Sequence, residues 1–117
     1  MIRIVISRDD KDSSRGFTIS GHSGYADKGS DIICSAISVL GQTAIASLTE
    51  LTNLKTDYKI DEGSAFLECK VKLPDDETDT DHIKASVILD LFGLGCRRTA
   101  ESYGRKYIDI RIINTRK

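Results

Sequence analysis

The stretch that decides the fold is Ser30–Asn53, SDIICSAISVLGQTAIASLTELTN. Apolar side chains recur in it at steps of three and four residues, which is the period of one face of an α-helix. This stripe consists of Ile33, Ile37, Leu40, Ala44, Leu48 and Leu51. Ser30 and Asp31 are both suitable N-cap residues, so we expect a helix that begins there and ends near Thr52 or Asn53. Gly41 inside the stripe predicts the close approach of another backbone.

Apolar residues alternate with polar ones on both sides of this helix, which predicts strands. The predicted strands are residues 2–7, 16–21, 57–60, 65–73 and 107–113. Residues 61–64, Asp-Glu-Gly-Ser, are typical of a hairpin turn, and Pro74 ends the strand that follows it. A second helix, capped by Thr80 or Asp81, should carry the apolar stripe Ile83, Val87, Leu91 and Leu94, with Ile88 and Phe92 alongside.

The predicted order of elements is ββαββαβ. Each strand has one apolar face and each helix has one apolar stripe, so the simplest arrangement is an α+β two-layer sandwich. It would have a mostly antiparallel sheet with two helices on one face. The length of 117 residues predicts a single domain over residues 1–117.

Composition favours a cytoplasmic globular protein. Apolar residues make up 39% of the chain and charged residues 30%, no apolar run approaches the roughly 20 residues of a membrane span, and the N-terminus lacks a signal-peptide layout. The net charge of −1 gives no bulk attraction to membranes or nucleic acid. Basic residues do gather towards the end, at Arg97, Arg98, Arg105, Lys106, Arg111, Arg116 and Lys117.

Three well-separated cysteines without a Cys-X-X-Cys pair argue against a disulfide framework. With only His22 and His82 in addition, no zinc-ligand spacing exists, and we expect no metal and no cofactor. Cys69, on the inner face of a strand, and Cys96, late in a helix, are expected to be structural. His82, at an acidic helix start, is expected to be a solvated surface group.

Cys34 falls in the first turn of the predicted long helix, where unpaired N–H groups and the helix dipole favour a thiolate and an oxyanion. His22 stands at the other end of the glycine-rich loop, close enough in sequence to meet the thiol and generate a reactive thiolate. A small buried cysteine and an exposed loop histidine fit the same spacing. The spacing alone therefore does not decide whether Cys34 and His22 form a catalytic pair.

Four further residues belong to this region. Asp31 is either a helix cap or a carboxylate that orients His22. Ser38, one turn after Cys34, either bonds within the core or lines the site. Gly24 and Gly29 allow the loop over residues 23–30 to act as a lid.

The segment Gly21-His22-Ser23, followed by a loop and then residues 29–38, resembles the signature of the ribosomal-processing cysteine protease family. The resemblance implies a Cys34/His22 dyad supported by Asp31 and Ser38. It also implies a homodimer that trims a short N-terminal extension from a large-subunit ribosomal protein precursor after an aromatic residue. The stretch Ser35-Ala36-Ile37 departs from the smaller residues usual in that family. An extended precursor tail would suit pairing with a sheet edge.

Two other classes compete with a protease. A ribosome- or RNA-binding module would use the basic C-terminal region, but few aromatics and no RNA-binding signature make nucleic acid an unlikely partner. A thiol redox sensor would explain a reactive Cys34 but gives His22 no role.

Overall fold

A computed structural model of the chain describes residues 1–9, 14–21, 28–61 and 65–114. The elements are β1 (Ile2–Arg8), β2 (Ser14–Ser20), α1 (Lys28–Leu51), β3 (Thr56–Asp61), β4 (Phe66–Val71), α2 (Thr80–Tyr103), the 3-10 turn η1 (Arg105–Tyr107) and β5 (Ile108–Asn114). This confirms the predicted order ββαββαβ. Most strand boundaries shift by one or two residues, as expected for sequence-based bounds.

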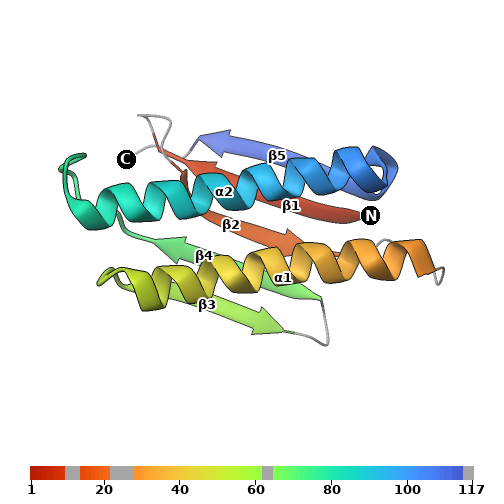
Figure 1. Ribbon diagram of the computed structural model, residues 1–117, viewed down its shortest axis with the longest axis horizontal. Coiled ribbons are helices and arrows are strands. Elements are labelled where there is room, and N and C mark those ends of the chain that lie inside the picture. The colour runs from red at the N-terminus through yellow and green to blue at the C-terminus, as the bar shows by residue number, and fades with distance from the viewer. Residues whose placement is uncertain (10–13, 22–27, 62–64, 115–117) are drawn as a thin grey trace.

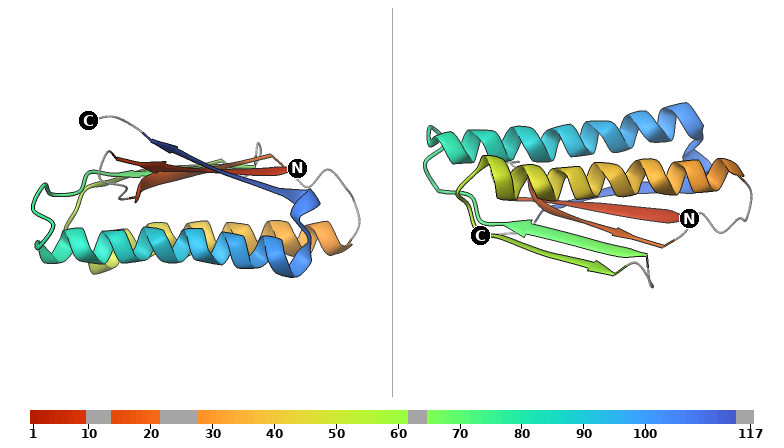
Figure 2. Two further views of the ribbon diagram at one scale, coloured as in Figure 1. Left: turned by 90° about the horizontal axis from the view of Figure 1, so that it is seen from above. Right: turned by 60° about the horizontal axis from the view of Figure 1, so that its bottom comes forward.

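The five strands form one sheet in the order β3-β4-β2-β1-β5. The pairs β1–β2, β2–β4 and β3–β4 are antiparallel, whereas β1 and β5 are parallel. Both helices lie side by side on one face of the sheet (Figures 1 and 2), and the other face is free of helices. The α+β two-layer sandwich with a mostly antiparallel sheet is therefore confirmed.

The core lies between the sheet and the two helices. Strand residues that face the helices are buried, among them Ile4, Phe17, Leu67 and Cys69. Most residues of the predicted α1 stripe pack against these strand residues, although the last member of the stripe, Leu51, is exposed. The rings of Phe17 and Phe92 stack with their centroids 3.9 Å apart, which joins β2 to α2.

The predicted core stripe of α2 is wrong, because all four of its residues are exposed (Ile83, Val87, Leu91 and Leu94). Of the two residues expected beside it, Phe92 is buried and Ile88 is partly buried against the core. The buried side consists of His82, Ala85, Leu89, Phe92, Cys96, Thr99 and Ala100. At about 100° per residue these two sets lie on opposite sides of the helix. Small side chains such as Ala85 and Cys96 allow α2 to approach the sheet and α1 closely. The cap is Asp79, which accepts hydrogen bonds from the backbone of Asp81 and His82, and not Thr80 or Asp81.

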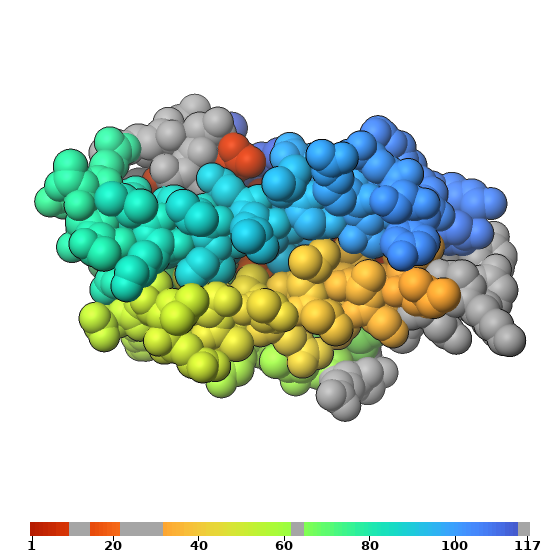
Figure 3. Space-filling model, viewed as in Figure 1, coloured from red at the N-terminus to blue at the C-terminus, as the bar shows by residue number. Residues whose placement is uncertain are grey.

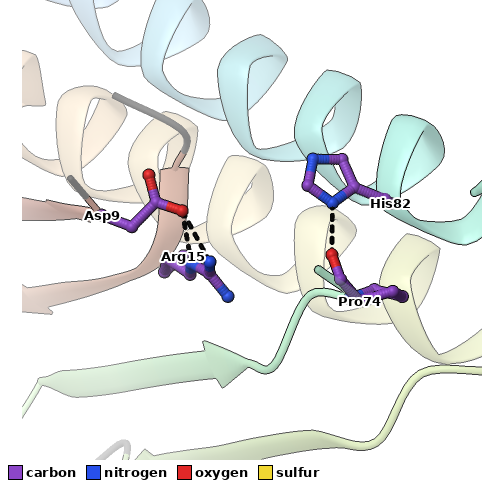
Figure 4. A network of polar contacts seen from close by, with 4 residues as sticks. All are labelled: Asp9, Arg15, Pro74 and His82. Carbon is purple, nitrogen blue, oxygen red and sulfur yellow. Dashed lines mark hydrogen bonds and ion pairs between the residues drawn. The ribbon is translucent and has the colours of Figure 1, made fainter. Parts of the chain in front are cut away.

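His82 and Asp9 are among the polar side chains buried beside the core (Figure 4). His82 is not the expected solvated group: it is 7% exposed, and its Nδ1 lies 2.7 Å from the carbonyl oxygen of Pro74. Because that oxygen only accepts, Nδ1 donates and fastens α2 to the connection that follows β4. Asp9 is buried at the end of β1 and accepts hydrogen bonds from Nε and Nη2 of Arg15 at 2.9 and 2.6 Å. This charged pair links β1 to β2.

Helix α1 differs from two expectations. Residues Ile32–Leu51 are long and apolar enough to cross a membrane by length and composition, contrary to the sequence-based estimate. A core helix passes the same test, and α1 packs Ile33, Ile37 and Leu48 against the sheet. Gly41 does mark a close approach, but by side chains and not by a backbone. A Cβ there would lie 2.8 Å from Cδ1 of Ile19.

Candidate active site

Helix α1 begins at Lys28, two residues before the earliest predicted cap. Cys34 consequently lies in the second helical turn and not in the first, so the unpaired N–H groups of the helix start are one turn away from its backbone. Asp31 is inside the helix, which removes its predicted role as N-cap and leaves the orientation of His22 as the remaining prediction. Gly29 belongs to the first turn of α1 and not to the loop.

Cys34 lines a cavity of about 440 Å³ between α1 and one end of the sheet. Buried residues from β1, β2, α1 and β4 form its floor, namely Ile2, Ile19, Ile37 and Leu67. More exposed residues surround it, namely Ser35, Val39 and Gln42 of α1 and Ile60 and Asp61 of β3. The cavity thus places an apolar surface next to a partly accessible thiol, which suits an apolar side chain of a bound peptide.

Ser38 lines the same cavity as Cys34, one turn further along α1. Its Oγ accepts a hydrogen bond from Nε2 of Gln42 at 3.0 Å. Cys34, Ser38 and Gln42 follow one another at steps of four residues and share one side of the helix. Ser38 therefore lies where the site-lining interpretation needs it. Gln42 was not predicted as a site residue. Its spacing of eight residues from Cys34, which is two steps of four along the helix, indicates that both lie on the same side of α1.

The three thiols occupy different environments. Cys69 and Cys96 are fully buried, as expected of structural residues, and burial raises the pKa of each thiol to about 12. Both therefore stay protonated and inert at neutral pH. Cys34 is half-buried at the cavity. Among the described residues it is the cysteine with access to a substrate.

Two predicted site residues, His22 and Gly24, lie outside the described residues, and so does most of the predicted lid. The catalytic dyad is therefore a prediction from the sequence, to which the structure adds the surroundings of Cys34. Within the described part of the chain, no group of three or more His, Cys, Asp or Glu side chains is placed to hold a metal ion.

The basic C-terminal residues that the structure describes belong to three elements, and Arg116 and Lys117 lie outside the described residues. Arg97 and Arg98 are on α2, Arg105 and Lys106 on η1, and Arg111 on β5. Arg111 donates to Asp109 at 3.0 Å.

Comparison with known proteins gives one family and a set of similar folds. Residues 1–109 match the family described as cysteine protease Prp. No curated protein sequence matches the chain. A ribosomal processing protease Prp from S. aureus, with a covalently linked product peptide, has 19% identity and a TM-score of 0.79 over 97% of this chain and 100% of that one.

The same S. aureus protease with a substrate peptide gives 20% identity and a TM-score of 0.76 over 98% and 100% of the two chains. A protein from Streptococcus mutans gives 22% identity and a TM-score of 0.80 over 98% and 96%. At these identities the structures establish a shared fold.

Proposed function

This chain belongs to the cysteine protease Prp family, whose members are peptide-bond hydrolases, and on that premise we propose that it removes an N-terminal extension from a large-subunit ribosomal protein precursor. The ribosomal substrate is supported by the similar S. aureus protein, which is a ribosomal processing protease that binds substrate and product peptides. The His22 and Cys34 spacing supports the same assignment from the sequence.

The chemistry is acyl transfer through the thiol. His22 takes the proton of Cys34, and the thiolate forms a C–S bond to the scissile carbonyl carbon. The C–N bond then breaks as His22 returns the proton to the leaving amine. Water hydrolyses the thioester, which releases the acyl product as a carboxylic acid and restores the thiol. Ser38 lines the cavity one turn from Cys34, where its hydroxyl can contact the reacting groups.

The observation that carries this proposal is the contrast between Cys34 and the other two cysteines. Cys34 opens onto an apolar cavity, whereas Cys69 and Cys96 are completely buried. Cys34→Ala should abolish cleavage of a precursor peptide, read by mass spectrometry, and leave the melting temperature nearly unchanged. Cys96→Ala is the matched control, in which cleavage should persist. Cleavage by well-folded Cys34→Ala would contradict the nucleophile assignment.

A homodimer is a further part of the proposal. The exposed stripe of α2, defined by Ile83, Val87, Leu91 and Leu94, lies opposite the buried side of that helix and so faces away from the sheet. Figure 3 shows the two helices side by side across this face of the molecule. Four apolar side chains in line on an exposed helix are typical of an interface. We place the contact between two copies on this stripe.

A cytoplasmic location completes the proposal. Cys34, Cys69 and Cys96 all belong to the described residues and none of them forms a disulfide, which fits a reducing compartment.

A further inference from the structure

β3 is an edge strand with an unusual inner face. Among the described strands it pairs with β4 alone, so residues 56–60 present unpaired backbone N–H and C=O groups along its other side. Figures 1 and 2 show that β3 extends beyond the cover of α1. Tyr58 and Ile60 point to the helix side, since they pair with buried Cys69 and Leu67, yet they are 56% and 44% exposed. The sheet therefore ends in an apolar shelf beside an open strand edge.

This shelf leads into the cavity of Cys34. Ile60 and Asp61, at the end of β3, line the cavity together with Cys34 and Ser38 of α1. The sheet has a second edge at β5, but the residues that line the cavity come from β1, β2, β3, β4 and α1 and not from β5. A peptide that follows β3 reaches the thiol without leaving the protein surface, whereas a peptide on β5 does not.

We propose that the substrate binds as an added strand along the free edge of β3, with Ile60 and Tyr58 as specificity-determining residues. Main-chain hydrogen bonds to β3 hold the peptide extended, and every second side chain rests on the apolar shelf. The intervening side chains lie beside Asp57, Lys59 and Asp61 on the opposite face of the strand. The preferred substrate is thus a segment with apolar residues at alternate positions. This inference rests on the proposed function and deepens it.

Backbone pairing makes a prediction that side-chain recognition does not share. In an antiparallel or parallel pair, successive amides of one strand point alternately towards and away from the partner. We would methylate each backbone nitrogen of a precursor peptide in turn and measure kcat/KM with the wild-type protein. Methylation should lower kcat/KM at least tenfold at every second position over about four residues and have little effect between them. A flat profile, or one without the period of two, would overturn the proposal.

The choice of edge is tested by a matched pair of variants. Ile60→Ser changes an isoleucine that is 44% exposed on the helix side of β3. Ile112→Ser changes one that is 51% exposed on the helix side of β5, where Ile112 pairs with buried Ile6. Ile60→Ser should raise KM for the peptide about tenfold with kcat nearly unchanged, and Ile112→Ser should leave both constants unchanged. An effect of Ile112→Ser in place of Ile60→Ser would show that the peptide binds at the β5 edge and would refute the inference.

Failure of the proposed protease activity and failure of peptide binding at β3 give different results. If the wild-type protein does not cleave any precursor peptide, the proposed function is wrong. If it cleaves the peptide but both the methylation scan and Ile60→Ser are without effect, the protease stands and the β3 inference falls. Because the methylation scan uses the unaltered protein, instability of Ile60→Ser does not remove the test.

Discussion

Gln42 donates a hydrogen bond from Nε2 to Oγ of Ser38 at 3.0 Å, on the side of α1 that carries Cys34. The amide occupies one acceptor position of the hydroxyl and leaves its hydrogen for another acceptor. We therefore expect Ser38→Ala to slow precursor cleavage about tenfold, which corresponds to a hydrogen bond of roughly 1.4 kcal/mol. Gln42→Leu should slow cleavage less, by about threefold. This variant removes the hydrogen bond that orients the Ser38 hydroxyl but keeps the hydroxyl itself.

The control for this pair is Thr43→Ala, an exposed neighbour of Gln42 on α1 that does not line the cavity. Cleavage kinetics and melting curves should be recorded for all three variants. A larger loss in Gln42→Leu than in Ser38→Ala, at equal stability, would show that the amide acts by itself.

Thiol alkylation should separate the three cysteines. Burial raises the pKa of Cys69 and of Cys96 to about 12, so both stay protonated from neutral pH up to about pH 10. In the folded protein, iodoacetamide at near-neutral pH should label Cys34 at least roughly tenfold faster than either of them. Peptide mapping of a time course reads all three sites together.

Two controls accompany the labelling. In denaturant the three rates should converge, since the protection of Cys69 and Cys96 comes from the fold. His22→Ala should slow the labelling of Cys34, because the imidazole that withdraws the thiol proton is gone. Equal rates in the folded protein would exclude a selectively reactive Cys34.

Leu91→Glu tests the homodimer. Leu91 is 61% exposed in the middle of the α2 stripe, and a carboxylate there would be buried without a partner in the proposed contact. Light scattering at micromolar concentration should give about twice the chain mass of 12.9 kDa for the wild type and the single mass for the variant. Ile113→Ser should remain dimeric. A wild-type mass near 12.9 kDa would refute the dimer.

His82 should contribute to stability and not to chemistry. Its Nδ1 donates to the Pro74 carbonyl at 2.7 Å in a buried setting. His82→Phe keeps the ring but leaves that carbonyl without its donor, which should lower the free energy of unfolding by about 1–3 kcal/mol in urea titrations. Thr80 is exposed, so the control variant Thr80→Ala should change the free energy of unfolding far less. If His82→Phe leaves the free energy of unfolding unchanged, water replaces the lost hydrogen bond.

The order and type of the elements were predictable because hydrophobic periodicity is local. The inner face of α2 was not, since that helix has two apolar sides and only packing against Phe17 and α1 selects between them. For the same reason His82 was misjudged: its acidic neighbours in sequence suggested solvent, while its partner, Pro74, lies eight residues away.

The reactive thiol of the candidate site could be predicted from the sequence, but the residues that form the cavity around it could not. Cys34 stood out by its position in the signature segment, and Ser38 followed from helical spacing. The cavity depends on where the β3–β4 hairpin meets α1, and no local pattern brings Ile60 beside Cys34. Gln42 escaped notice because an exposed glutamine on a helix is ordinary until its partner is known.

The parallel pairing of β1 with β5 has a consequence for biosynthesis. β1 is made before β5, yet Ile2 pairs with Ile108, more than 100 residues later in the sequence. Until β5 is synthesised, one side of β1 remains an open edge inside a sheet that is otherwise able to assemble. The pairing of β1 with β5 therefore waits until β5 has been made, and a nascent chain stopped before β5 should associate through the edge of β1.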